Sequence, residues 1–307
     1  MSSDSPFRGV LSPVVTPFDT NLKPDGDRLA KQCNWLLSND VGLAVFGTNS
    51  EANSLSTSEK RALLDHLGAA GIPAARMMPG TGACSLADSV ELTQHAVEMG
   101  CGGVLMLPPF YYKGVSDEGL YRNFAEVIER VGDSRLRIYL YHIPPVAQVP
   151  ISLNLIERLL KDFPEVIAGV KDSSGDWSNT KAMLDQFQPQ GFDVFAGSET
   201  FLLDTLRSGG AGCISATANV NPKAISALAA TWENDDADEQ QARLDEIRSV
   251  FQGYVMIPAL KAAVAIYSGD EQWSVLRPPL VELDGAERAA LAEKLDAVGF
   301  TMPGLAD

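Results

Sequence analysis

Lys171 directly follows residues 166–170 (Val-Ile-Ala-Gly-Val), an apolar run typical of a buried strand. A lysine has a pKa of about 10.4 in water, and burial lowers it toward neutrality. The neutral amine can then attack a ketone and form an imine, which accepts electrons when a neighbouring C–C bond breaks. The alternative is a strand-end lysine that only pairs with Asp172 or a loop carbonyl.

Three further residues at predicted strand ends could serve the same chemistry. Tyr141 ends the preceding strand, and its phenol could relay protons, although an aromatic of the barrel wall is equally compatible with this position. Thr48 and Asn49 follow residues 43–47 and bring hydroxyl, amide and backbone N–H donors that suit a carboxylate. Ordinary turn chemistry is the alternative interpretation for this pair.

The elements that must position these residues alternate regularly along the chain. Eight short apolar segments predict buried strands, at residues 9–15, 43–47, 76–80, 103–107, 136–141, 167–171, 193–197 and 211–215. Amphipathic stretches between them predict helices, at residues 26–39, 57–70, 85–99, 117–131, 152–162, 176–188 and 199–208. After residue 220 only helices are predicted, at residues 222–232, 235–251, 258–268 and 285–298.

This alternation predicts an α/β fold, a (β/α)₈ TIM barrel with a C-terminal helical extension. We expect the barrel to occupy residues 1–225, with its last helix from about 222–232, and the helical appendix to occupy 233–307. A doubly wound open sheet would also alternate, but Thr16-Pro-Phe-Asp19 follows the first strand instead of a glycine-rich phosphate loop. In a TIM barrel the active site lies at the carboxyl ends of the strands, where the residues above converge.

Composition excludes several classes of function. The 307 residues carry a formal net charge of −16, which repels nucleic acids and anionic membrane surfaces. No apolar run is long enough to span a membrane, and the first residues do not resemble a secretion signal, so we expect a cytoplasmic protein. The four cysteines and three histidines lack metal-ligand spacing, and no metal is expected.

Five ordered motifs resemble one known family from end to end. They are Gly47-Thr-Asn-Ser-Glu51, Pro109-Phe-Tyr-Tyr112, Tyr139-Leu-Tyr-His-Ile-Pro144, Gly169-Val-Lys-Asp-Ser-Ser174 and Gly212-Cys-Ile-Ser215. Each stands at a predicted strand end. The chain resembles the dihydrodipicolinate synthase / N-acetylneuraminate lyase superfamily of class I, Schiff-base-forming pyruvate aldolases.

The resemblance implies a role for each matching residue. Lys171 aligns with the Schiff-base lysine and Tyr141 with the tyrosine that shuttles protons at the imine. Thr48 and Asn49 align with the pair that binds the pyruvyl carboxylate.

It also implies how the site is completed. Tyr112 aligns with a tyrosine that, in the synthases, enters the neighbouring subunit's site, and Ile214 with a residue whose carbonyl lines the pyruvate pocket. Ser173, Gly197 and Glu199 are candidate contacts for the tail of the substrate. The family implies a homotetramer, a dimer of dimers, with no metal or organic cofactor.

Two departures from the family pattern bear on the substrate. Val146 stands where the synthases have an arginine that holds the carboxylate of aspartate semialdehyde, so true dihydrodipicolinate synthase activity is not expected. Ser50 replaces a glycine of the carboxylate-binding motif, so the backbone must adapt if that position needs positive φ. Asn49 matches the 4-hydroxy-2-oxoglutarate aldolase branch instead.

These residues predict a lyase that cleaves a 2-keto-3-deoxy acid, or forms it, through a Schiff base on Lys171. A dehydratase acting on such sugar acids through the same imine is the first alternative. A non-catalytic protein that binds 2-oxo acids is the alternative of another class, although binding alone needs neither Lys171 nor Tyr141. The identity and chirality of the substrate stay open.

Overall fold

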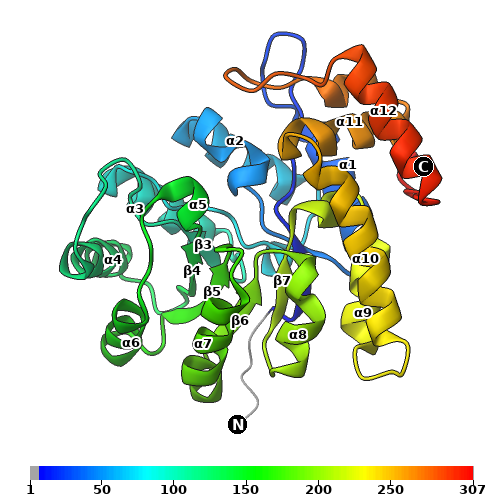
Figure 1. Cartoon of the computed structure of the whole chain (residues 1–307). Helices are drawn as coiled ribbons and strands as arrows, with labels where there is room; N and C mark the ends of the chain where they lie inside the picture. The colour runs from blue at the N-terminus through cyan, green and yellow to red at the C-terminus, as the bar shows by residue number, and fades with distance from the viewer. Residues whose placement is uncertain (1–6, 307) are drawn as a thin grey trace. The chain divides into compact units, whose positions relative to one another are not determined.

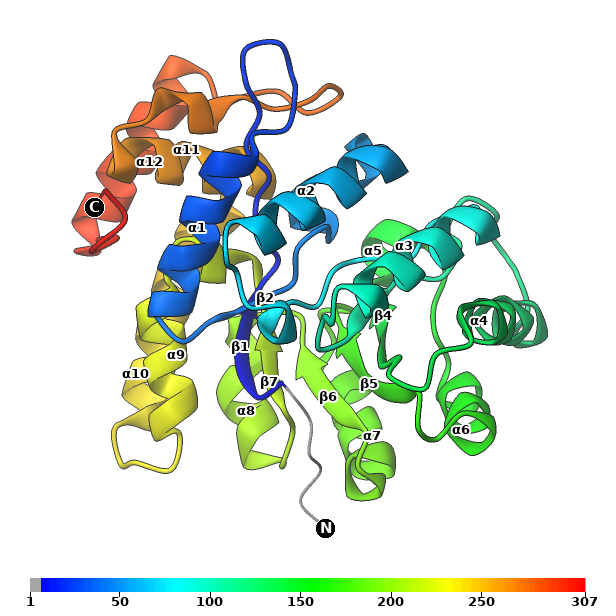
Figure 2. The same cartoon turned by 180° about the vertical axis from the view of Figure 1, so that it is seen from behind.

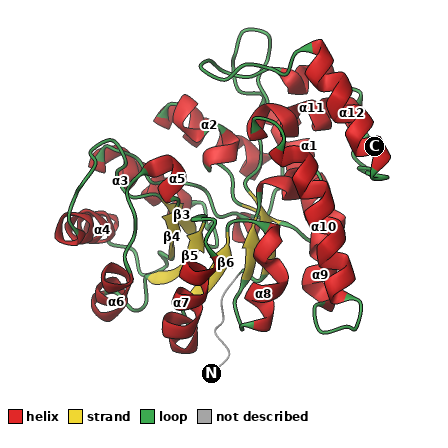
Figure 3. Cartoon of the chain, viewed as in Figure 1, coloured by secondary structure: helices red, strands yellow, loops and turns green. Residues whose placement is uncertain are grey.

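The structure is a computed structural model that describes residues 7–306. It divides into two compact units, which we call unit 1 (residues 7–9 and 73–214) and unit 2 (residues 10–72 and 215–306). Figure 1 follows the chain from blue to red, and Figure 3 separates its helices from its strands. The division into a barrel of residues 1–225 and an appendix of 233–307 stays a proposal.

Unit 1 carries parallel strands that alternate with helices. Its strands run in the order β7-β6-β5-β4-β3 and comprise β3 (Val104–Met106), β4 (Ile138–His142), β5 (Ile167–Asp172), β6 (Asp193–Ala196) and β7 (Gly212–Ile214). Its α-helices are α3 (Leu86–Glu98), α4 (Asp117–Val131), α5 (Pro144–Ala147), α6 (Leu153–Asp162), α7 (Trp177–Phe187) and α8 (Leu202–Arg207). Every residue of β4 is buried, as expected for a parallel strand covered on both faces. Helices α4, α6 and α7 lie outside these strands (Figures 1 and 2).

Unit 2 holds the start of the barrel pattern and the C-terminal helices. Strand β1 (Gly9–Ser12), which begins in unit 1, pairs in parallel with β2 (Gly42–Leu43). The helices are α1 (Gly26–Ser38), α2 (Thr57–Ala69), α9 (Pro222–Thr231), α10 (Ala237–Gln252), α11 (Met256–Ser268) and α12 (Gly285–Ala297). Helix α10 packs beside α9, and both views show the two side by side (Figures 1 and 2).

Short 3₁₀ helices complete the element order. One of them directly follows α7, and another directly precedes α8. They are η1 (Thr48–Ser50), η2 (Ala52–Ser54), η3 (Ala74–Arg76), η4 (Gln188–Gln190), η5 (Glu199–Phe201), η6 (Ala216–Asn219) and η7 (Glu271–Ser274). The predicted helix at 199–208 therefore consists of η5 followed by α8.

The helix starts follow the local signals in the sequence. Ser56 accepts a hydrogen bond from the N–H of Glu59, whose side chain accepts one from the N–H of Ser56, so α2 begins with a capping box. Ser85 and Ser116 cap α3 and α4 in the same way with one bond each. The structure thus confirms the three predicted helix starts. They could be predicted because a helix cap involves only residues close together in the sequence.

The third predicted strand is the main difference from expectation. Residues 76–80 form no strand among the described residues, and only Gly80 makes a parallel bridge, to Leu105. The carbonyl of Pro79 accepts from the N–H of Leu105 at 2.9 Å, and the N–H of Thr81 donates back to Leu105. Because Pro79 has no N–H to donate, the pairing stops at this single bridge.

In the described part of the chain, no single helix is long and apolar enough to span a membrane. Helices α10 and α11 pass that test only as a pair, and the chain bends by 107° between them.

Candidate active site

Side chains on β4, β5 and β6 stack in layers because their residues pair in register. Tyr139 pairs with Gly169, and two residues later Tyr141 pairs with Lys171. A Cβ at Gly169 would lie 2.7 Å from the Tyr139 ring, so the missing side chain leaves the space that this ring fills. The Tyr139 ring also meets Phe195 edge-on, with centroids 6.0 Å apart. Tyr139 thus lies two residues before Tyr141 on the same face of β4, whereas Phe195 pairs with Lys171 itself.

Lys171 and Tyr141 are the predicted pair that the structure brings together. Lys171 Nζ donates to Tyr141 Oη at 3.3 Å, and both residues are only 2% exposed. Lys171 Nζ also lies 4.4 Å from the centre of the tyrosine ring. A buried amine beside a phenol that can take or return its proton is the arrangement that imine chemistry requires.

The opposite faces of the same strands carry a second polar pair, His142 and Asp172. His142 Nδ1 accepts from the N–H of Ile151 at 3.0 Å, which leaves the proton of the neutral ring on Nε2, 4.0 Å from Asp172 Oδ1. Asp172 Oδ2 accepts from Thr180 Oγ1 at 2.6 Å and from Asn179 Nδ2 at 3.0 Å, both on α7. The Asp172 carboxylate thus joins the end of β5 to α7.

Burial is the main influence on the pKa of His142. The loss of water around the ring lowers this pKa below the usual histidine value, while the nearby Asp172 carboxylate acts in the other direction. His142 is therefore a neutral side chain at pH 7. It supports the strand end behind Tyr141 and does not face the Lys171 amine, because neighbouring residues of a strand point to opposite faces.

Ser173 and Gly197, two candidates for the substrate tail, contact each other. The N–H of Gly197 donates to the Asp172 carbonyl at 2.7 Å, and a Cβ at Gly197 would stand 2.1 Å from Ser173 Oγ. Close approach of the ends of β5 and β6 thus explains the glycine. Ser173 is half-buried beside it.

The remaining unit 1 candidates differ in exposure. Glu199 is 1% exposed at the start of η5, and Ile214 is fully buried at the end of β7. Tyr111 and Tyr112 are each 73% exposed and meet edge to face, with ring centroids 5.3 Å apart. Tyr112 therefore takes no part in the buried Lys171–Tyr141 pair of its own chain.

A loop and a short helix carry Tyr112 and Val146. Lys113 Nζ donates to the carbonyl of Phe110 and, at 2.7 Å, to that of Ala147, so it joins this loop to α5. Val146 lies on α5 and is 60% exposed. Helix α5 was not predicted, although two prolines at its first turn are a recognised helix-start signal.

Thr48 and Asn49 form a tight turn in unit 2. They lie half-exposed in η1, between the buried residues Gly47 and Ser50. Ser50, which replaces the family's glycine, is buried, and its Oγ accepts from the N–H of Gly47 at 3.1 Å. Positive φ occurs at Glu51, not at Ser50, so the serine fits without strain.

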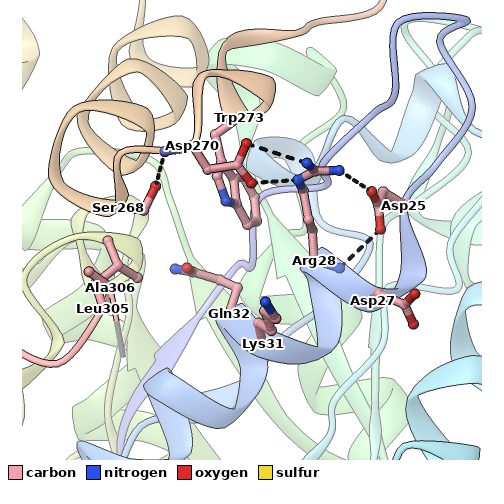
Figure 4. Close-up of a pocket in the computed structure, with 10 residues that line it drawn as sticks. All are labelled: Asp25, Asp27, Arg28, Lys31, Gln32, Ser268, Asp270, Trp273, Leu305 and Ala306. Atoms are coloured by element: carbon pink, nitrogen blue, oxygen red, sulfur yellow. Dashed lines mark hydrogen bonds and ion pairs between the residues drawn. The ribbon is translucent and has the colours of Figure 1, made fainter.

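A separate cavity of about 340 Å³ lies in unit 2 (Figure 4). Arg28 crosses it and is held by Asp25 and, at 2.6 Å, by Asp270. Trp273 forms part of the wall, and none of the predicted site residues lines this cavity. Across residues 7–306, no group of three or more His, Cys, Asp or Glu side chains is arranged to hold a metal ion.

Comparison with known proteins identifies the class of protein that this fold and site define. Parallel strands that alternate with helices, with a buried lysine–tyrosine pair at their carboxyl ends, are the features of a barrel enzyme acting on carbonyl compounds. A model of the dihydrodipicolinate synthetase family matches residues 6–298. The chain belongs to this family, whose members are carbon–carbon lyases.

Individual relatives cover nearly the whole chain. An uncharacterized DapA-like lyase from Chloroflexus aurantiacus is 33% identical over 92% of this chain and 94% of its own length. Dihydrodipicolinate synthase from Agrobacterium tumefaciens is 32% identical and superposes with a TM-score of 0.87, covering 94% of this chain and 99% of that one. A prophage protein of the same family from E. coli K12, whose structure was solved in complex with pyruvate, is 26% identical. It superposes with a TM-score of 0.86, covering 96% of this chain and 99% of that one. The predicted barrel fold with helical C-terminal region is confirmed.

The contacts of two charged side chains, Asp172 and Lys261, were not predicted from the sequence. The sequence suggests Asp172 only as a partner for Lys171, whereas in the structure its carboxylate contacts α7. Lys261 was not singled out, although it is a lone charge in the apolar helix α11. A charged residue in such a helix needs a buried partner, which is a signal the sequence does contain.

Proposed function

We propose that this lyase forms a Schiff base between Lys171 and the C2 ketone of pyruvate or a 2-keto-3-deoxy acid, and catalyses reversible aldol cleavage. The observation that carries the proposal is the buried contact of 3.3 Å between Lys171 Nζ and Tyr141 Oη. The pyruvate bound to a related solved structure supports the substrate class.

Each step has a residue to perform it. The Lys171 amine attacks C2 to give a carbinolamine, whose hydroxyl takes the proton of Tyr141 Oη and leaves as water, giving the protonated imine and the Tyr141 phenolate. Tyr141 Oη takes the proton of the C4 hydroxyl as the C3–C4 bond breaks, and an aldehyde leaves. The bond electrons form the enamine of pyruvate, which Tyr141 or water reprotonates at C3 before hydrolysis frees Lys171.

Carboxylate recognition is assigned to Thr48 and Asn49 through their sequence motif, with the Ile214 carbonyl lining the pyruvate pocket. Val146 supplies no cation where the synthases use arginine, which disfavours aspartate semialdehyde and favours an uncharged or hydroxylated aldehyde. Ser173 and Glu199 are proposed to contact that part of the substrate. We further propose a cytoplasmic homotetramer, with no metal or organic cofactor in the reaction.

Borohydride trapping tests the proposal. Reduction in the presence of pyruvate, followed by peptide mass spectrometry, should place a single adduct on Lys171. Lys261 is an internal control because it too is a buried lysine, with a fully enclosed side chain, and it should stay unmodified. The variant Lys171→Met should give no adduct. Absence of an adduct in the unaltered protein, or an adduct at Lys261 instead, would show the proposal to be wrong.

Product analysis separates cleavage from dehydration. With 2-keto-3-deoxy sugar acids, pyruvate and an aldehyde are the expected products. A dehydrated 2-oxo acid would identify a dehydratase that uses the same imine.

A further inference from the structure

A buried ion pair stands directly behind the turn that holds Thr48 and Asn49. Glu51 Oε1 accepts from Lys261 Nζ at 2.8 Å, and neither side chain is exposed. Lys261 comes from α11, 210 residues further along the chain, and all of these residues belong to unit 2. Removing two opposite charges from water is costly, so such a pair persists only where its geometry is well satisfied.

Both charged groups have further partners that complete the geometry. Glu51 Oε2 accepts from the backbone N–H of Arg277 at 3.1 Å. Lys261 Nζ donates to the Thr16 carbonyl at 2.9 Å and lies 4.6 Å from the centre of the Phe18 ring. The carboxylate and the ammonium are therefore each held at two or more points.

The same contacts constrain the backbone of the turn. Glu51 adopts the left-handed conformation, with φ 55° and ψ 33°, which is unfavourable for a residue with a side chain. This conformation lets the N–H of Glu51 bond to the Thr48 carbonyl and close η1. Thr16 Oγ1 donates to the Ser50 carbonyl at 2.7 Å, so the residue that Lys261 holds also fixes the turn itself.

We infer that Glu51 and Lys261 are a positioning pair for substrate recognition: they hold Thr48 and Asn49 in the geometry that binds the carboxylate of the 2-oxo acid. The inference rests on the proposed function of that turn. The anchors on one side are buried, whereas Thr48 and Asn49 are half-exposed, so the turn is fixed from inside and open on its other side. Neither Glu51 nor Lys261 needs to touch the substrate.

The test compares two ketones that differ in the carboxylate. Trapping rates at Lys171 are measured with pyruvate and with acetone, and the ratio of the two reports carboxylate recognition separately from the reactivity of Lys171. The double variant Glu51→Gln/Lys261→Met removes both charges together, since a single substitution would leave one buried charge unpaired and risk unfolding. We expect the pyruvate-to-acetone ratio to fall by about tenfold or more, as loss of a charge-assisted contact implies.

Glu59→Gln is the matched control. Glu59 pairs with the Arg277 side chain at 2.5 Å in the same region, but it does not contact the turn at Thr48 and Asn49. Its ratio should stay within about twofold of the unaltered protein. An unchanged ratio in the double variant, including an equal loss with both ketones, would overturn the inference. Failure of the unaltered protein to form any pyruvate adduct would overturn the proposed function, and with it this inference.

Discussion

At the scale of single residues, the hydroxyl group of Tyr141 is the group beside Lys171 that we propose transfers protons during catalysis. Lys171 Nζ lies 3.3 Å from Tyr141 Oη and 4.4 Å from the centre of the Tyr141 ring, so both parts of the side chain contact the lysine. In the proposed mechanism only Oη transfers a proton, whereas the ring contributes packing contacts. A substitution can therefore separate the two.

Tyr141→Phe should fold normally and lose catalysis. Because the ring stays in place and Oη is removed, we expect turnover of a 2-keto-3-deoxy acid to fall by about two orders of magnitude or more. Pyruvate release gives the rate, and thermal unfolding gives the control for folding. Turnover within about threefold of the unaltered protein would exclude Tyr141 from proton transfer.

His142 gives a residue-scale prediction about pH. Its pKa in the folded chain lies below the unfolded value of about 6.5, because burial disfavours the charged ring. As pH falls below about 6.5, the unfolded chain takes up a proton that the folded chain resists, so the free energy of unfolding decreases. The imidazole NMR signals of His142 should titrate below that value.

His142→Asn is the control for this prediction, since the Asn oxygen can accept from the N–H of Ile151 but does not titrate. The decrease in stability between pH 7 and pH 5 should be smaller in this variant. A His142 signal that titrates above about 6.5 would contradict the prediction.

At the scale of elements, the ends of β5 and β6 approach each other closely at Gly197, beside the candidate site. Gly197→Ala would place a methyl group against Ser173 Oγ and 2.8 Å from the Asp172 carbonyl. We expect a loss of about 1–3 kcal/mol in the free energy of unfolding, since the two strand ends must separate. Denaturant titration measures it, and slower trapping of pyruvate should accompany it.

Gly285→Ala is the corresponding control. Gly285 begins α12, and a Cβ there would meet nothing within 4 Å. This substitution should leave the free energy of unfolding unchanged or slightly higher. If Gly197→Ala and Gly285→Ala had the same free energy of unfolding, β5 and β6 would tolerate the extra methyl group, which would contradict the prediction.

At the scale of the whole molecule, the exposed aromatic residues of unit 1 argue for an assembly. Tyr111, Tyr112 and Val146 are all more than half exposed, and such apolar surface commonly marks an interface. Tyr112 is exposed and is not part of the buried Lys171–Tyr141 pair, so we propose that it completes the site of a neighbouring subunit in a homotetramer. Light scattering should then report four chains, and a monomer would contradict the proposal.

Mixing two inactive variants tests the exchange of Tyr112 between subunits. Lys171→Ala lacks the nucleophile, and Tyr112→Phe lacks the relay hydroxyl. When the two are unfolded together and refolded, hybrid oligomers would contain sites with Lys171 from one chain and Tyr112 from the other. Activity above that of either variant refolded alone is expected, and no recovery would place Tyr112 outside the neighbouring site.

Much of the fold followed from local patterns in the sequence. The helix starts at Ser56, Ser85 and Ser116 could be predicted because a cap involves residues three positions apart. The strand ends near Tyr141 and Lys171 could be predicted to within one residue, because a buried strand is a short apolar run with polar residues after it. The bridge at Gly80 could not, since the length of a pairing depends on the neighbouring strand as well.

The sequence by itself determined that Lys171 lies near the end of a buried strand, one residue before its last residue, Asp172, and that the family motifs follow in order, because both properties belong to contiguous residues. Only the tertiary structure decided that Lys171 faces Tyr141 while Asp172 faces α7, because register between strands is set by packing across the sheet. Only it paired Glu51 with Lys261, since no local pattern links residues 210 positions apart. The sequence indicates which side chains could take part in chemistry, and contacts between distant segments set the distances between them.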